Sequence, residues 1–173
     1  LAGSPREAEA AATRFETEIQ RLRERYAGAR TVSVFIQIDD QPLYTVGGQH
    51  VINEAVTLCG GRNVFGDLRQ VAPTVDLEAV LARDPQVILS TDDTIAEPAA
   101  DWQRWPRMTA VKVGAVYSLP ADLVARATPR LAEGVALTCA ALDDARRRLH
   151  GFYRLRPGRN RLWDHDRLYL PHL

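Results

Sequence analysis

The sequence predicts a three-layer α/β fold, in which a small parallel sheet lies between helices and follows a long first helix. Three observations predict it. Apolar residues make up 46% of the 173 residues, which is enough to form one packed core. Short segments rich in Val and Ile recur along the chain, as is typical of strands that are buried on both faces. Helical segments separate them, and strands that alternate with helices pair in parallel.

Residues 1–28 are predicted to form the long first helix. Ser4 and Glu7 flank Pro5 in the pattern of a capping box, and Gly28 ends the helix. Apolar residues recur in alternating steps of four and three, at Ala8, Ala12, Phe15, Ile19, Leu22 and Tyr26. Because this stripe is only one residue wide per turn, the helix is expected to lie along a surface rather than inside a core.

Three later segments are predicted to be buried strands, and they cover residues 31–38, 86–91 and 115–119. A fourth strand is compatible with the pattern. Ligands of parallel sheets bind at the loops that follow the carboxyl ends of the strands. Here those loops are residues 39–49, 92–97 and 120–128.

Helices are expected between and after these strands. The first runs from about His50 to Leu58, and Cys59, Gly60 and Gly61 stop it. The stretch that follows, residues 60–75, lacks periodicity and is predicted to be a structured loop. A second helix is expected over 76–83, with Asp76 as the cap and Asp84-Pro85 at the end. A third is expected over 95–105, together with a turn. The last helix is expected to begin at Thr128-Pro129, with one face formed by Leu131, Val135, Cys139, Leu142 and Leu149.

Charge is divided unevenly along the chain, although the formal net charge is zero. Residues 1–145 carry 14 Lys and Arg against 20 Asp and Glu, whereas residues 146–173 carry 8 against 2. A neutral chain does not bind nucleic acid through bulk charge, so no nucleic-acid partner is expected. The run Arg146–Arg148 is interpreted as a solvated helix end. No apolar stretch reaches the roughly 18 residues that a membrane span needs.

No enzyme motif is present, and candidate chemistry is limited to isolated polar residues. Asp39-Asp40 and Asp92-Asp93 follow strands, where carboxylates could act as acid and base or hold Mg²⁺; the simpler interpretation is solvated loops. His50 has no second His or Cys at ligand spacing, so no metal site is expected. Trp102 and Trp105 are three residues apart and are interpreted as core or rim packing. A standalone α/β enzyme domain that uses the Asp residues stays open as an alternative.

Four phrases stand out in order along the chain. They are Pro42-Leu43-Tyr44-Thr45-Val46-Gly47-Gly48, Cys59-Gly60-Gly61-Arg62-Asn63-Val64-Phe65, Val75 to Pro85 running into Val87-Ile88-Leu89, and Ala115 to Pro120 followed by Arg126 and Pro129-Arg130-Leu131. In this order they resemble the C-terminal Rossmann-like lobe of the helical-backbone (class III) periplasmic substrate-binding proteins. Among these, the phrases are most similar to the vitamin B12 (cobalamin) binding proteins of ABC importers. The resemblance covers about residues 5–147.

The resemblance implies a division of the chain into three parts. Residues 1–28 match the helix that joins two lobes, residues 29–148 match the C-terminal substrate-binding lobe, and residues 149–173 form a basic, aromatic tail outside the family pattern. It also implies that an N-terminal lobe is missing from this chain. The implied protein is periplasmic, is not an enzyme, needs no cofactor, binds cobalamin or a similar metal chelate between its lobes, and delivers the ligand to an ABC permease in the inner membrane.

Residue roles follow from the same resemblance. It implies ligand contacts at Tyr44, Ala72, Asp122, Leu123 and Arg126. Two of these depart from the cobalamin proteins, because the family has Trp where this chain has Ala72 and Leu123. A third departure is a family Glu at Ala125. A smaller, less aromatic wall predicts weaker or altered corrinoid binding. Glu78, on the outer face of its helix, is implied to dock an Arg pocket of the permease.

The two cysteines are implied to form a disulfide. Cys59 ends one helix and Cys139 lies on the inner face of the last helix, and cysteines at the matching positions are paired in the cobalamin-binding protein. The periplasm is oxidising and favours such a bond. Two free buried thiols, packed as small apolar side chains, are the alternative.

Two further functional alternatives stay open. The same fold could bind haem or an iron–siderophore. In the other alternative, the chain is a cytoplasmic interaction module built from a relic lobe, with the basic tail as its contact.

Overall fold

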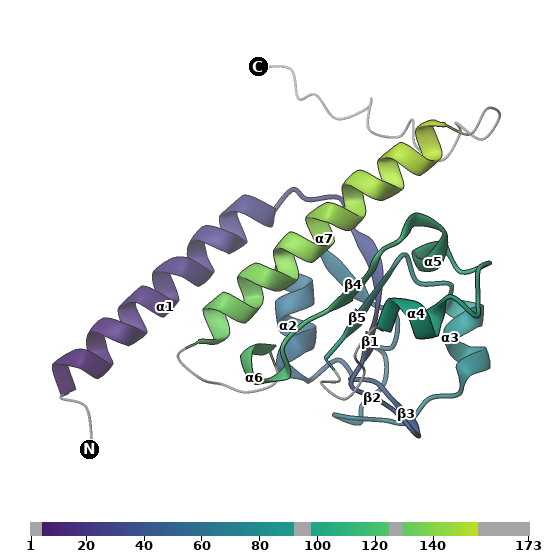
Figure 1. Cartoon of the computed structure of the whole chain (residues 1–173). Helices are drawn as coiled ribbons and strands as arrows, with labels where there is room; N and C mark the ends of the chain where they lie inside the picture. Colours follow the sequence, from purple (N-terminus) through teal and green to yellow (C-terminus); the bar gives the residue numbers. More distant parts are fainter. Residues whose placement is uncertain (1–4, 92–97, 125–129, 156–173) are drawn as a thin grey trace.

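A four-stranded parallel sheet forms the centre of the molecule (Figure 1). The computed structural model describes residues 5–91, 98–124 and 130–155. Its sheet has the order β4-β1-β5-β6, and every pair of neighbouring strands is parallel. The strands are β1 (Val32–Gln37), β4 (Gly61–Asn63), β5 (Val87–Ser90) and β6 (Val116–Ser118). The predicted α/β class and the three predicted strands are confirmed.

The fourth strand, β4, lies in the stretch that was predicted to be a loop. It is three residues long, and its residues Gly, Arg and Asn carry no apolar periodicity. Its strand conformation comes from its partner, because Val32 pairs with Gly61 and Val34 pairs with Asn63. Such a strand depends on tertiary pairing, which explains why the loop prediction was wrong here.

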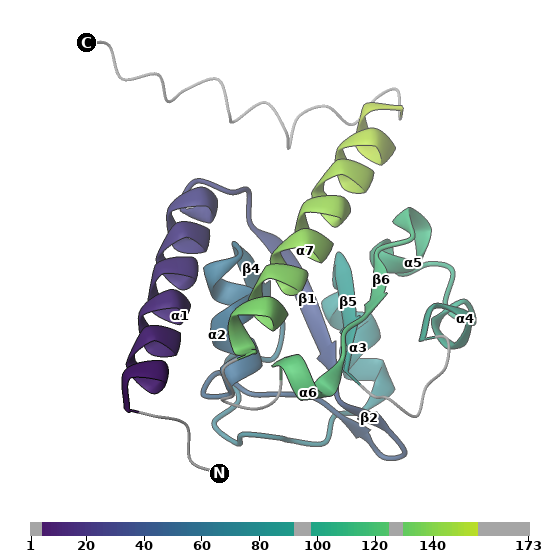
Figure 2. The same ribbon diagram turned by 60° about the vertical axis from the view of Figure 1, so that its left-hand side comes forward.

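Helices cover both faces of the sheet (Figure 2). One face carries α1 (Pro5–Tyr26), α2 (Val51–Leu58), α6 (Ala121–Val124) and α7 (Leu131–Arg154). The opposite face carries α3 (Leu77–Arg83) and α4 (Pro98–Trp102). Helix α5 (Thr109–Val113) contributes to both cores, with Ala110 in the smaller one and Val113 in the larger one. The predicted three-layer arrangement is therefore present.

Strand residues alternate between two hydrophobic cores. Val34, Val87 and Leu89 pack against α2 and α7 in the larger core. Phe35 and Ile88, their neighbours in sequence, point to the other face and pack with Trp102, Val80 and Met108. Because successive side chains of a strand point to opposite faces, a strand buried on both faces reads as a continuous apolar run. That is why β1 and β5 were visible in the sequence.

The long first helix lies along the surface, as its narrow stripe predicts. It runs beside α2 and α7 (Figures 1 and 2). Only its C-terminal part is well covered, where Leu22 and Tyr26 are buried. The Tyr26 hydroxyl donates to Asp143 of α7 at 2.8 Å. Ser4, the predicted cap, lies outside the described residues.

The last helix extends beyond the part of the chain that resembles the family. It continues to Arg154, so the proposed boundary between residues 148 and 149 falls inside α7. The reason is that its apolar stripe continues past the family-like region. Ala145 and Leu149 are both buried in the larger core. Residues 156–173 lie outside the described part of the chain, as do Thr128 and Pro129.

Several short elements escaped the sequence analysis. A hairpin of β2 (Asp39–Asp40) and β3 (Leu43–Tyr44) occupies the first predicted loop, with a cis peptide bond between Gln41 and Pro42. Helices α5 and α6 were also missed, since each has only four or five residues. Asp76 occupies the N-cap position of α3 as predicted, but its side chain makes no capping hydrogen bond.

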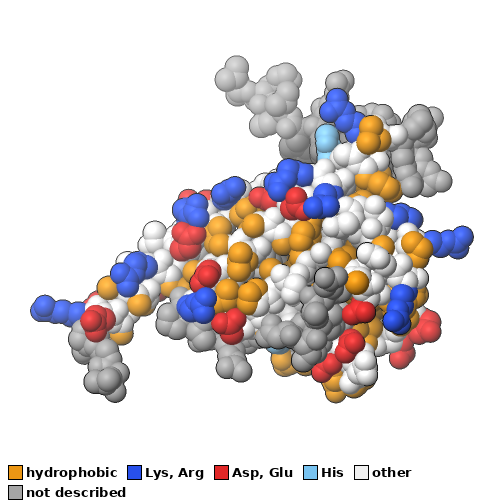
Figure 3. Space-filling view, in the orientation of Figure 1, with side chains coloured by type: hydrophobic (Ala, Val, Ile, Leu, Met, Phe, Trp, Pro, Cys, Tyr) orange, Lys and Arg blue, Asp and Glu red, His pale blue; other side chains and the backbone are white. Residues whose placement is uncertain are grey.

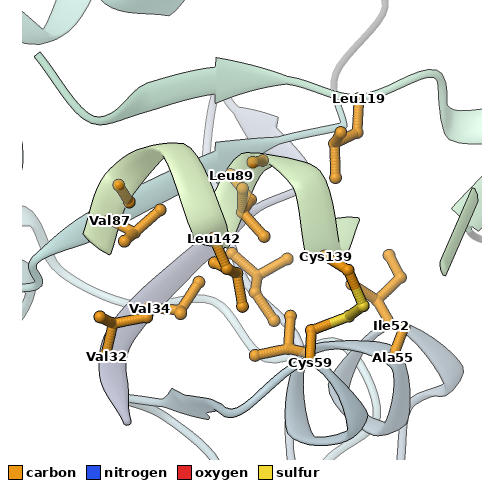
Figure 4. Close-up of a cluster of buried hydrophobic side chains, with 14 of the residues drawn as sticks. Val32, Val34, Ile52, Ala55, Cys59, Val87, Leu89, Leu119, Cys139 and Leu142 are labelled. Carbon is orange, nitrogen blue, oxygen red and sulfur yellow. A yellow bond between two sulfur atoms is a disulfide. The ribbon is translucent and has the colours of Figure 1, made fainter. Parts of the chain in front are cut away.

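The predicted disulfide between Cys59 and Cys139 is present (Figure 4). It joins the end of α2 to the middle of α7, with the two α-carbons 4.8 Å apart. Both residues are completely buried beside Ile52 and Leu142. The alternative of two free thiols is excluded in this structure. No described helix has the length and apolar character of a membrane span.

Candidate functional site

The carboxyl edge of the sheet is where the predicted ligand-binding loops meet. Because the strands are parallel, β1, β5 and β6 end side by side, at Gln37, Ser90 and Ser118. The β2–β3 hairpin follows β1, and α6 follows β6. Figures 1 and 2 place the hairpin and α6 at the same end of the molecule. The topology therefore gathers most of the predicted contacts at one edge.

Tyr44 and Ala72 lie in a small backbone-bonded unit at this edge. Tyr44 pairs with Asp39 across the hairpin and bridges to Thr74. The next residue, Thr45, donates its N–H to the Pro73 carbonyl at 3.0 Å. Tyr44 is half-buried and Ala72 is exposed. The hairpin and the segment around Ala72 are thus held together by main-chain hydrogen bonds, which do not depend on side-chain identity.

Asp122 and Leu123 lie on α6 and differ in accessibility. Asp122 is exposed and forms an ion pair with Arg130 at 3.3 Å. Leu123 is only 4% exposed and packs in the larger core, so its side chain offers almost no area to a ligand in this structure. Arg126 lies outside the described residues. Asp122 and Tyr44, both described by the structure, share no hydrogen bond or ion pair.

His50 caps a helix in this structure. Its Nδ1 accepts the Ile52 N–H at 3.1 Å, at the first turn of α2. Burial lowers the pKa of this imidazole, which favours the neutral form that the cap requires. In the part of the chain that is described, no three His, Cys, Asp or Glu residues gather as a metal site.

The first of the two Asp pairs shapes the hairpin. Asp39 Oδ1 accepts the N–H groups of Asp40 and Gln41, at 2.7 and 3.2 Å. This is the local turn-forming bond that Asp commonly makes. Both aspartates are exposed. The arrangement agrees with the simpler interpretation of a solvated loop. Asp92 and Asp93 lie outside the described residues.

A hydrogen bond between Gln37 and Trp102 was not anticipated. Trp102 Nε1 donates to Gln37 Oε1 at 2.8 Å, and each residue is only 4% exposed. The Trp102 ring also packs against Phe35 and Trp105, which fits the interpretation of core packing. One sequence signal was available: Gln37 is a large polar residue that directly follows the apolar run Val34-Phe35-Ile36.

The basic run on α7 pairs with acids on the same helix. Arg146 binds Asp143 at 2.8 Å, and Arg147 and Arg148 both bind Asp144. In Figure 3, basic and acidic side chains lie side by side over this helix. Arg146 also donates to the carbonyl oxygens of Arg30 and Cys59, at 2.7 and 2.6 Å. The three arginines therefore have intramolecular roles.

Glu78 lies in the first turn of α3, on its exposed side. Leu77, Val80 and Leu81 of the same helix pack toward the smaller core. The structure gives the Glu78 carboxylate no ion pair with any described residue. Arg83, at the other end of the helix, instead binds Asp67 at 3.0 Å. The Glu78 charge is thus directed to solvent.

Comparison with known proteins gives consistent matches. The periplasmic binding protein family matches residues 1–123. A vitamin B12-binding protein of Vibrio cholerae is 34% identical over 145 residues, which are 83% of this chain and 52% of that protein. A vitamin B12-binding protein of Yersinia pestis is 37% identical over 129 residues, or 73% of this chain and 44% of that protein. The chain spans about half the length of the curated relatives it matches.

Solved structures agree with the sequence matches. The crystal structure of the periplasmic vitamin B12 binding protein BtuF of Vibrio cholerae superposes with a TM-score of 0.77 at 34% identity, covering 84% of this chain and 57% of that one. The periplasmic heme-binding protein RhuT of Roseiflexus sp. RS-1 superposes with a TM-score of 0.71 at 20% identity, covering 83% and 58%. The second likeness concerns the fold alone.

Proposed function

This chain belongs to the periplasmic binding protein family, and from that membership we propose that it forms the C-terminal lobe of a cobalamin receptor in an ABC importer. The identity of 34% with a vitamin B12-binding protein over 83% of the chain carries the proposal. Delivery of the ligand to an ABC permease belongs to the same proposal.

A receptor of this kind works by capture rather than chemistry. The ligand lies against the carboxyl edge of the sheet, and a second lobe covers its other side. The long α1, fixed to the lobe through Leu22, Tyr26 and the Tyr26–Asp143 hydrogen bond, is a stiff connection between the lobes. Stiffness of this kind limits closure to small motions.

The ligand-facing residues proposed are Tyr44, Ala72, Asp122 and Arg126. Tyr44 offers an aromatic ring to a flat ligand, and aromatic rings bury a large area on contact. Ala72 and Asp122 are exposed at the same edge. Leu123, which the resemblance also implies as a ligand contact, has a buried side chain, so we propose that it shapes the wall behind Asp122.

A periplasmic location accompanies the proposal. Both cysteines are oxidised in a buried disulfide, and disulfides persist in the bacterial periplasm but are rare in the cytosol. The disulfide thus argues against the cytoplasmic interaction module. Labelling of free thiols in protein taken directly from the periplasm, without reduction, is expected to give no alkylated cysteine.

Absorption spectroscopy tests the ligand. Purified chain is mixed separately with cyanocobalamin, haemin and a ferric hydroxamate siderophore, and each mixture is separated by equilibrium dialysis. Retention of cyanocobalamin above the other two supports the proposal. Preferential retention of haemin would replace it with the second candidate, a haem receptor of the same fold. Turnover of esterase or phosphatase substrates would favour the enzyme alternative.

Glu78 is proposed to dock the permease. The side chain is exposed, its carboxylate has no ion pair among the described residues, and its neighbours hold α3 firmly on the lobe. The simpler alternative is that Glu78 only complements the N-terminus of α3, an effect of about 0.3–1 kcal/mol. The two interpretations differ in whether the Glu78 carboxylate interacts with a partner protein.

Charge reversal at Glu78, in a receptor that contains both lobes, distinguishes the two interpretations. Glu78→Arg is expected to leave ligand affinity unchanged and to weaken association with the transporter, measured by surface plasmon resonance. Glu54→Arg, which reverses an exposed acid in the first turn of α2 on the opposite face of the sheet, serves as the matched control. If Glu78→Arg lowers ligand binding and association equally, Glu78 is not a docking residue.

A further inference from the structure

A hollow of about 310 Å³ lies at the carboxyl end of β1, between the β2–β3 hairpin, α3 and α4. Its lining comes from three segments that are distant in sequence. Leu43, Leu77 and Trp105 provide apolar walls, and Gln37 and Trp102 contribute polar atoms. The volume is at the small end of the range for ligand pockets. It fits a side chain of a ligand rather than a whole macrocycle. Tyr44, Ala72 and Asp122 do not line it.

The amide of Gln37 has a fixed orientation in this hollow. An indole N–H is a donor only, so Trp102 Nε1 must face the oxygen of the amide, and the bond to Oε1 is 2.8 Å long. The Nε2 of Gln37 then presents two N–H donors. The structure gives no hydrogen bond from Gln37 Nε2 to a described residue. Only 4% of the surface of Gln37 is exposed. A buried donor without a partner destabilises the folded chain, and a ligand acceptor would remove that cost.

The charges around the hollow select against an anionic ligand group. Asp40 and Asp101 contribute two carboxylates to the lining, and Arg104 contributes one guanidinium. The hollow therefore carries a net negative charge, and a ligand carboxylate would be repelled. The same two carboxylates accept hydrogen bonds. A ligand group that fits this hollow accepts a hydrogen bond from Gln37 Nε2, donates one to Asp40 or Asp101, and carries no charge.

We propose that this hollow binds a neutral primary carboxamide group of the ligand. The carboxamide oxygen accepts from Gln37 Nε2, its NH₂ donates to the rim carboxylates, and its alkyl stem lies against Leu43, Leu77 and Trp105. The identification of the ligand as cobalamin rests on the proposed function. Cobalamin carries carboxamide side chains around its ring, whereas haem carries carboxylates. The hollow would thus contribute to selection between the two.

The direct test uses isosteric small probes on the full chain. Propionamide and propionate have the same shape and differ in charge and in donors. Side-chain ¹⁵N–¹H signals of Gln37 and Trp102 are followed by NMR as each probe is added. Propionamide is expected to shift both signals, with an apparent affinity about tenfold higher than that of propionate. Equal shifts with the two probes, or none with propionamide, would overturn the inference. This comparison requires no variant.

A variant then assigns the effect to the buried amide. Gln37→Glu keeps an acceptor for Trp102 but removes the two donors, and it is expected to weaken propionamide binding about tenfold. Gln103→Glu is the matched control, because it adds the same charge at an exposed position of the chain next to Trp102 and does not line the hollow. Gln37→Met, which removes the donors without adding a charge, provides the comparison if a buried Glu unfolds the chain. Unchanged propionamide binding in a folded Gln37 variant would refute the assignment.

Cyanocobalamin titration separates this inference from the proposed function. Suppose that wild type binds cyanocobalamin while Gln37 variants bind both cyanocobalamin and propionamide as tightly as wild type does. In that case the carboxamide site is wrong and the receptor function stands. If propionamide binds in a Gln37-dependent way while cyanocobalamin does not bind, the carboxamide site stands and the receptor function is wrong.

Discussion

At the scale of single residues, His50 links the stability of the chain to pH. Its Nδ1 accepts the Ile52 N–H, which only an unprotonated nitrogen can do. Burial lowers the pKa of His50 from the ordinary value of 6.5, so the unfolded chain binds its proton more readily than the folded one. By linkage, stability then rises with pH in this window. The cap is fully present above about pH 6.5 and is lost as pH falls through the lower folded pKa.

The prediction concerns the free energy of unfolding, measured with urea at pH 7.5 and at pH 5. Wild type is expected to lose about 1 kcal/mol more than His50→Asn over this interval, because Asn caps helices equally well and does not titrate. His150→Asn, at an exposed position of α7, is the control and should behave as wild type. A His50→Asn variant with the same pH dependence as wild type would contradict the assignment.

At the scale of elements, Gly134 sets how closely α6 approaches α7. A Cβ added at Gly134 would overlap the Leu123 carbonyl oxygen and would lie 3.0 Å from Val124 Cγ1. Helix propensity alone favours Ala over Gly by about 1 kcal/mol. The structure reverses the sign at this position, because the obstacle is backbone and cannot rotate away.

Gly134→Ala is therefore expected to destabilise the chain by about 1–3 kcal/mol, measured by urea unfolding. Gly151→Ala is the matched control in the same helix, since a Cβ there meets nothing within 4 Å. It is expected to stabilise the chain by up to about 1 kcal/mol. Stabilisation by both substitutions would mean that α6 does not contact α7 as described.

The disulfide joins α2 to α7 across 80 residues of sequence. In the chain-entropy model, a loop of this length stabilises the folded state by about 4 to 5 kcal/mol, a large share of the 5–15 kcal/mol typical of a domain. Cys59→Ala/Cys139→Ala is expected to lower the urea midpoint strongly.

Reducing agent supplies the control for this pair of substitutions. Dithiothreitol is expected to lower the urea midpoint of wild type to nearly that of the double variant and to leave the double variant unchanged. Equal midpoints for oxidised wild type and the double variant would show that the bond does not contribute to stability.

At the scale of the whole molecule, the ligand-binding edge that we propose would hold a ligand from one side. A ligand held from one side keeps much of its surface in water, and tight small-molecule sites bury most of the ligand. Ala72 and Leu123 also replace the Trp residues that the family resemblance implies. Calorimetric titration of this chain with cyanocobalamin is therefore expected to give a dissociation constant between roughly micromolar and millimolar. A nanomolar value would contradict this expectation.

The sequence by itself determined the fold class, the strands β1, β5 and β6, and both long helices. Each of these has a local physical signal: continuous apolar runs for β1 and β5, and a stripe of period 3.6 for α1 and α7. The family resemblance, carried by ordered phrases, supplied the cysteine pair. It also supplied Tyr44, Ala72 and Asp122, which the topology places at one edge of the sheet, while their role as ligand contacts stays a prediction.

Only the tertiary structure decided the features that depend on a distant partner. β4 is a strand because Val32 and Val34 lie beside it, and Leu123 is buried because Gly134 lets α7 approach. Gln37 is a polar residue after an apolar run, until Trp102, 65 residues away, fixes its amide and leaves two donors in a hollow. Such features follow from contacts between segments far apart in sequence, and periodicity along the chain does not encode them.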